Sequence, residues 1–216
     1  MRSVFRKHLA ELEHDLYDMA GMVSSSITDS VECLKVQDLE WAKRIRKADK
    51  HINNKRWEIE EKAINLIATQ QPVATDLREV IAVLNIITDL ERMGDYAEGI
   101  AKITRKIGQE EHVKTLIDIP RMAEVADDMI TKAMNAYADR DENAAKTISD
   151  QDNEVDELYK QVFRELVSIM IEDPGKITRC TYLLWVAHNL ERIADRVTNI
   201  CERIIFLVTG EIVENV

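Results

Sequence analysis

One short motif occurs twice in this chain of 216 residues. Residues 89–95 read Asp-Leu-Glu-Arg-Met-Gly-Asp, and residues 189–195 read Asn-Leu-Glu-Arg-Ile-Ala-Asp, at an offset of 100 residues. Each copy holds a glutamate, an arginine beside it, and an aspartate four residues after the glutamate. A spacing of four places both acids on one helix face, a turn apart. The motif therefore predicts two similar helices, each with a pair of carboxylates that needs positive charge nearby.

A second repeat precedes each copy of the motif. Residues 49–53, Asp-Lys-His-Ile-Asn, match residues 152–156, Asp-Asn-Glu-Val-Asp, at an offset of 103. At the same offset Ile27 matches Ile130 and Ala42 matches Ala145. An internal repeat of about 100 residues indicates two copies of one structural unit. We expect the boundary in the polar segment 108–118, which gives a first domain of residues 1–110 and a second of residues 111–216.

Each copy shows the periodicity of three helices. Apolar residues recur at spacings of three and four, and no segment alternates with the period of two that a half-buried strand shows. Only six Gly and three Pro interrupt the chain. The helices predicted from this pattern span residues 4–35, 39–68, 73–107, 119–138, 142–171 and 175–208. Asp38 and Asp141 are suitable N-caps for the second helix of each copy. The predicted fold is all-α: two tandem, pseudo-symmetric three-helix bundles.

The charge and the cysteines narrow the class of protein. The formal net charge of −11 disfavours a nucleic-acid partner. The three cysteines, Cys33, Cys180 and Cys201, are scattered, which is typical of reduced thiols in a cytosolic protein. No secretory apolar region and no run of bilayer-spanning length stands out, so we expect a cytoplasmic protein. We interpret the three tryptophans as packing residues or, where exposed, as anchors for a partner.

The acids of both repeats lie beside apolar helix faces. Asp49 and Asp152 each follow an isoleucine by four residues, and Glu91 and Glu191 each follow a leucine by seven. Burying lone carboxylates there is costly unless they are paired or bind a metal ion. Antiparallel packing of the second and third helices would bring four oxygen-bearing residues together in each copy. The candidate sets are Asp49, Asn53, Glu91 and Asp95 in the first copy and Asp152, Asp156, Glu191 and Asp195 in the second.

Two interpretations of these sets are open at this point. In the first, Arg92 and Arg192 neutralise the acids in salt-bridge clusters. In the second, a metal ion does so, and the duplication of acids on two separate helices of each copy favours this interpretation. Carboxylates without Cys or paired His suit Mg, Ca, Mn or Fe better than Zn. The Glu-x-x-His pattern of di-iron bundles is absent. His188 lies three residues before Glu191 and is interpreted as a packed or surface residue.

On these residues the chain resembles the PhoU family. The resemblance rests on the two Leu-Glu-Arg-x-x-Asp motifs and on the repeated segments at Asp49 and Asp152, and it covers essentially the whole chain. It implies two tandem three-helix bundles in a cytoplasmic accessory protein of the high-affinity phosphate ABC transporter. Some members carry metal clusters, and the resemblance implies them at Asp49, Glu91 and Asp95 in the first copy and at Asp152, Asp156, Glu191 and Asp195 in the second. Asn53 departs from the second copy, where Asp156 stands, so the two sites are not expected to be equally occupied.

The resemblance also implies a regulatory role. Members of the family are thought to link the transporter to a membrane sensor histidine kinase and to keep phosphate-starvation genes off when phosphate is plentiful. We therefore expect a non-enzymatic regulator, a homodimer that reaches the membrane through its protein partners. The alternatives are a metal-dependent phosphohydrolase and a metal-buffering helical protein. The sequence shows no P-loop and no nucleophile motif, which favours the regulator.

Overall fold

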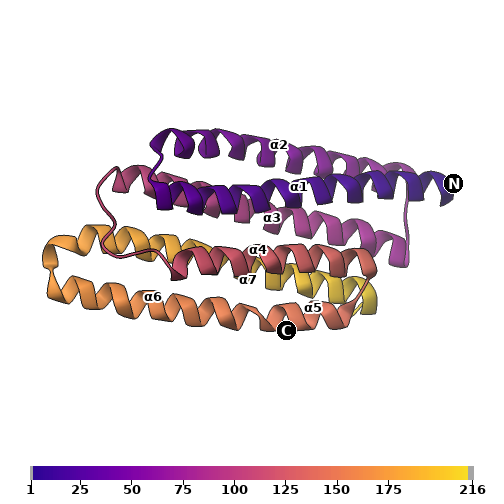
Figure 1. Ribbon diagram of the computed structural model, residues 1–216. Coiled ribbons are helices and arrows are strands. Elements are labelled where there is room, and N and C mark those ends of the chain that lie inside the picture. The colour runs from indigo at the N-terminus through magenta and orange to yellow at the C-terminus, as the bar shows by residue number, and fades with distance from the viewer. Residues whose placement is uncertain (1, 214–216) are drawn as a thin grey trace.

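The computed structural model describes residues 2–213 as helices packed side by side (Figure 1). The first half contains α1 (Arg2–Val36), α2 (Leu39–Gln70) and α3 (Ala74–Ile107). The second half contains α4 (Asp118–Asp139), α5 (Glu142–Asp150), α6 (Asp152–Glu172), the 3₁₀ turn η1 (Pro174–Lys176) and α7 (Ile177–Thr209). The described residues contain no strand, so the predicted all-α class is confirmed. None of the described helices combines the length and the apolar character needed to cross a bilayer.

Local sequence signals set the helix ends in both halves. The Asp38 carboxylate accepts hydrogen bonds from two backbone N–H groups in the first turn of α2, at 2.9 and 2.8 Å. Asp141 accepts the equivalent bonds at the start of α5. An aspartate in this position typically stabilises a helix by about 1 kcal/mol. Gly108 ends α3 with a φ of 73°, a conformation that glycine adopts without strain.

The second half departs from the prediction of one helix over residues 142–171. The structure divides this segment at Gln151, between α5 and α6. Residues 150–153 read Asp-Gln-Asp-Asn, and the short side chains of Asp and Asn compete with helical hydrogen bonds of the backbone. Here the Asn153 side chain donates to the Asp150 carbonyl at 3.0 Å. The equivalent residues 47–50, Lys-Ala-Asp-Lys, contain better helix formers, and α2 runs unbroken through them.

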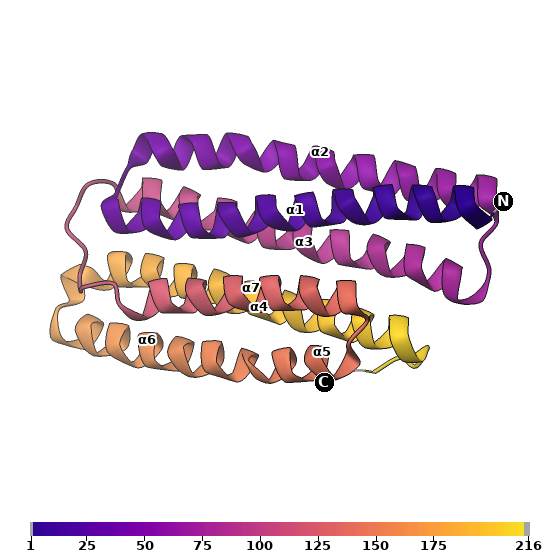
Figure 2. The same ribbon diagram turned by 45° about the vertical axis from the view of Figure 1, so that its right-hand side comes forward.

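The central helices α3 and α7 lie side by side and join the two halves (Figures 1 and 2). α3 also contacts α1 and α2, and α7 also contacts α4, α5 and α6. Both helices are therefore buried on more than one face, and a single hydrophobic cluster contains residues of both halves. A Cβ atom at Gly99 would lie 3.0 Å from the side-chain nitrogen of Asn189. The missing side chain therefore allows the two helices to approach closely.

Limited proteolysis tests this architecture. The connection between α3 and α4, residues 108–117, is partly or fully exposed and carries no helix, so we expect a protease to cut there first. The two fragments should stay together, because the α3–α7 contact buries apolar residues of both. Size-exclusion chromatography of the nicked protein should give one peak, and a denaturing gel should give two bands. Separation of the fragments on the native column would contradict the shared core.

Candidate metal centres

In the first half, α2 brings Asp49 against the acidic motif of α3. Asp49 is only 8 % exposed. One of its carboxylate oxygens, Oδ2, accepts a hydrogen bond from the Asn53 side chain at 2.8 Å. The other, Oδ1, is buried without a hydrogen-bond partner. A Cβ atom at Gly94 would lie 3.5 Å from this oxygen, so Oδ1 faces the stretch of α3 between Glu91 and Asp95.

Asp152 holds the equivalent position in the second half, as the first residue of α6. Its Oδ1 atom is also buried without a hydrogen-bond partner. Leaving such a group unpartnered costs roughly 1–3 kcal/mol, and such atoms are uncommon in folded proteins. Because the same oxygen lacks a partner in both copies, the feature belongs to the repeated unit. Neither aspartate forms an ion pair with the side chains in these positions. A positive charge beside the unpartnered oxygen would therefore stabilise each one.

Neighbouring acids surround both aspartates. Burial, and then the charges of acids on α3, raises the pKa of Asp49 to about 6. Burial, and then the charges of acids on α6 and α7, raises the pKa of Asp152 to about 6 as well. The structure therefore brings the predicted members of each set near one another. The acids that act on the first aspartate are Glu98, Asp95 and Glu91, and those that act on the second are Asp195, Asp156 and Glu191.

An arginine pairs with the two acids of the repeated motif in each half. Arg92 lies 3.7 Å from Glu91 and 3.2 Å from Asp95. Arg192 forms the equivalent two ion pairs in the second half, at 2.6 and 2.8 Å. With the side chains in these positions, no three His, Cys, Asp or Glu residues within 2–213 are grouped closely enough to hold a metal ion. Salt bridges thus account for Glu91, Asp95, Glu191 and Asp195, whereas one buried oxygen each of Asp49 and Asp152 has no partner.

Glu98 belongs to the first set and was not identified from the repeat. It follows Asp95 by three residues and therefore lies on the same side of α3. Among the charges that raise the pKa of Asp49, that of Glu98 is the largest. Its carboxylate also forms ion pairs with Arg46 of α2, at 3.3 Å, and with Lys102 of α3. The spacing after Asp95 was the available signal, but the second copy does not repeat it.

The two sets hold the same number of carboxylates in different arrangements. The first half has Asn53 where the second has Asp156, and Glu98 where the second has Thr198. Each set therefore contains four carboxylates, one of which has moved from the second helix of the unit to the third. Carboxylate oxygens are the ligands that hard cations prefer. This donor chemistry and the two unpartnered oxygens fit such an ion.

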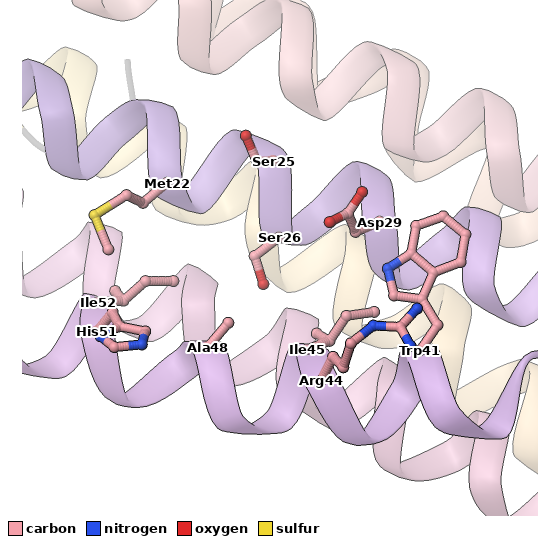
Figure 3. Close-up of a pocket in the computed structure, with 10 residues that line it drawn as sticks. All are labelled: Met22, Ser25, Ser26, Asp29, Trp41, Arg44, Ile45, Ala48, His51 and Ile52. Atoms are coloured by element: carbon pink, nitrogen blue, oxygen red, sulfur yellow. The ribbon is translucent and has the colours of Figure 1, made fainter.

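A separate groove of about 400 Å³ lies between α1 and α2 (Figure 3). Ile45 and Ile52 lie along it on α2, while Asp29 and Trp41 lie together at one end. A second groove of about 380 Å³ lies between α4 and α5, the equivalent helices of the other half. Because both halves have one, the grooves follow from the packing of the repeated unit. None of the eight predicted site residues lines either groove.

Comparisons with known proteins agree on one family. The model of that family, described as the PhoU domain, matches this chain twice, over residues 16–104 and 119–204. A curated relative from Clostridium acetobutylicum, a phosphate-specific transport system accessory protein PhoU homolog, is 42 % identical over 99 % of this chain and 98 % of its own length. The crystal structure of PhoU from Pseudomonas aeruginosa superimposes with a TM-score of 0.90 at 33 % identity, over 96 % of this chain and 100 % of that one. The phosphate transport system regulatory protein PhoU from Streptococcus pneumoniae gives 0.90 at 30 % identity, over 97 % and 99 %.

The pKa shift of Asp49 predicts how pH affects the metal-free protein. The folded-state pKa of about 6 lies above the unfolded value near 3.9, so ionisation costs more in the folded state. The penalty is absent below about pH 4, grows between about pH 4 and 6, and is complete above about pH 6. Asp49→Asn should therefore raise the free energy of unfolding by about 1–2 kcal/mol at about pH 7.5 and change it little at about pH 4.

Urea unfolding in the presence of a chelator measures both values. Glu124→Gln is a matched control because this side chain is 68 % exposed, and it should change the stability by less than about 0.5 kcal/mol. A loss of stability in Asp49→Asn near neutral pH would show that the charged carboxylate is already well accommodated without metal.

Proposed function

The chain belongs to the PhoU family, and we propose that it acts as an accessory regulator of a phosphate transport system rather than as an enzyme. The observation that carries the proposal is the similarity to a curated accessory protein of a phosphate-specific transport system. That similarity extends over 99 % of this chain and 98 % of the relative. The comparison is therefore with the whole relative and not with one of its parts.

The proposed mechanism is regulation by binding in the cytoplasm. The protein binds the phosphate ABC transporter and a sensor histidine kinase, and it keeps phosphate-starvation genes off when phosphate is plentiful. The core that the two halves share gives a rigid body that offers fixed surfaces to two partners at once. Binding that favours the inactive state of the kinase shifts the kinase population towards that state. A homodimer would present each surface twice.

The two acidic sets are proposed to hold hard metal ions. The support is the pair of unpartnered oxygens on Asp49 and Asp152 together with the carboxylates around them. Iron, manganese, magnesium and calcium suit these ligands better than zinc. A bound ion supplies the missing positive charge and holds two helices of the unit in register. The residues proposed to hold it are Asp49, Asn53, Glu91, Asp95 and Glu98 in the first half and Asp152, Asp156, Glu191 and Asp195 in the second.

Deletion of the gene tests the regulatory role. We expect a starvation-gene reporter to be active at high phosphate in the deletion strain, because the signal that holds the kinase inactive is lost. A plasmid copy of the wild-type gene should restore repression, and an empty plasmid should not. Normal repression in a deletion strain with no second copy of the gene would contradict the role and leave the fold and the family unchanged.

Charge-removing substitutions test the metal sites one half at a time. The pair Glu91→Gln and Asp95→Asn should remove metal from the first half only, because the second set lies on other helices. The equivalent pair at Glu191 and Asp195 should do the reverse. Elemental analysis of the purified variants measures the metal content per chain. The control replaces the exposed acids of α2 at positions 58 and 61 by glutamine and should keep the full content. If neither half-site variant loses metal, the acids are salt-bridge partners only.

A further inference from the structure

The two halves repeat the backbone, but the second helix of the unit carries opposite charge in the two halves. Residues 43–56 of α2 contain seven Lys or Arg and one Asp. The equivalent residues 146–159 contain one Lys and five Asp or Glu. Some of these cations serve the fold, since Lys55 pairs with Asp15 at 2.6 Å and Arg56 with Glu91 at 3.8 Å, but the acidic segment of the other half shows that the unit also folds without a cationic helix at this place. A cluster of like charge repels itself, so it calls for an explanation outside the stability of the helix.

The cations of α2 continue onto the end of α3 and form a cationic patch. The Arg46–Glu98 ion pair joins the two helices there. Lys47, Lys50 and Arg105 are exposed and form no ion pair with another residue of the described chain. The patch lies where α2 begins and α3 ends, at the left of Figure 1. Its members are Lys43, Lys47, Lys50, Lys102, Arg105 and Lys106.

Two aromatic side chains of α7 border the patch. The Lys106 ammonium lies 5.7 Å from the ring centre of Trp185 and 5.9 Å from that of Tyr182. Trp185 is 50 % exposed, so it is one of the tryptophans that do not serve the core. Trp and Tyr side chains beside Lys and Arg are typical of surfaces at the boundary between water and lipid headgroups, and here Trp185 is exposed while Tyr182 is half-buried.

We propose that the cationic patch binds the anionic headgroups of a bilayer. The end of the protein where α2 begins and α3 ends then faces the membrane. The long side chains of Lys47, Lys50 and Arg105, which form no ion pair within the described chain and lie on two helices, suit a fluid array of phosphates. Fixed pairs with an acidic protein would suit a more ordered arrangement. The net charge of −11 opposes approach of the protein as a whole. Screening limits that repulsion, because the Debye length is about 8 Å in physiological salt and the acidic segment lies in the other half.

The inference rests on the proposed function only for placing the protein beside a membrane-bound transporter. Vesicle co-sedimentation tests it without any transporter, so its failure is distinct from failure of the reporter experiment. The vesicles are pure phosphatidylcholine or an equimolar mixture with phosphatidylglycerol. The full chain should sediment with the mixed vesicles at low salt, should not sediment with neutral ones, and should be released at high salt.

Matched variants locate the surface. Lys47→Glu, Lys50→Glu and Arg105→Glu together should weaken binding at least tenfold. The control, Lys7→Glu, Lys160→Glu and Arg164→Glu, changes the net charge equally on other exposed surfaces and should weaken it by less than about threefold. Both variants should keep the helical circular dichroism of the wild type. A protein that retains only Trp185 among its tryptophans should show a blue-shifted emission with the mixed vesicles.

Three outcomes would overturn the proposal. The first is that the wild type does not sediment with the mixed vesicles. The second is that the control variant loses binding as strongly as the patch variant. The third is that the emission of Trp185 does not change. If the wild type does not bind vesicles, and the patch variant but not the control loses repression in cells, the patch binds an acidic protein surface. The proposal of lipid binding is then wrong.

Discussion

The contact between α3 and α7 is the constraint on which the rest of the structure depends. The first residue of each copy of the motif makes this contact. Asp89 of α3 accepts hydrogen bonds from Asn199 and Arg196 of α7, at 3.2 and 3.3 Å. Asn189 of α7 lies against Gly99 of α3, which is the same pair of positions with the halves exchanged. One motif therefore does two tasks: its first residue joins the halves, and its two later acids face the second helix of their own half.

Local patterns predicted most of the fold, and the physical reason is that they act within a few residues. The helix periodicity and the aspartate caps at Asp38 and Asp141 are of this kind, and the structure confirms both. The apolar pattern continues across Gln151, so periodicity alone predicts one unbroken helix there. Only the weak helix propensity of residues 150–153 marks the break. The domain boundary near 110 stays a prediction, since the two halves share one core.

The candidate sites show what a repeat reveals and what it hides. The repeat predicts Asp49 and Asp152 as site residues, and both carry the same unpartnered oxygen. Glu98 stayed hidden because the second copy places its fourth carboxylate on the other helix, at Asp156. A comparison of copies detects what both retain, whereas a compensating change appears only when the side chains are seen in space. The surroundings of Trp185 also appear only in space, because its ring lies near Lys106 of α3, which belongs to the other half.

Glu98 connects the acidic set of the first half to the cationic patch. Its charge raises the pKa of Asp49, and its carboxylate pairs with Arg46 and Lys102. Positive charge added at the acidic set would compete for this carboxylate and would loosen its hold on the two cations. Lys102 of the patch and the neighbouring Arg46 would then carry less neutralised charge, and this surface would attract an anionic surface more strongly. The second half has no such connection, because Thr198 stands at the equivalent position and α5 and α6, which together correspond to α2, are acidic. Occupancy of the two sites would therefore have different consequences for binding, although the backbone around them is the same.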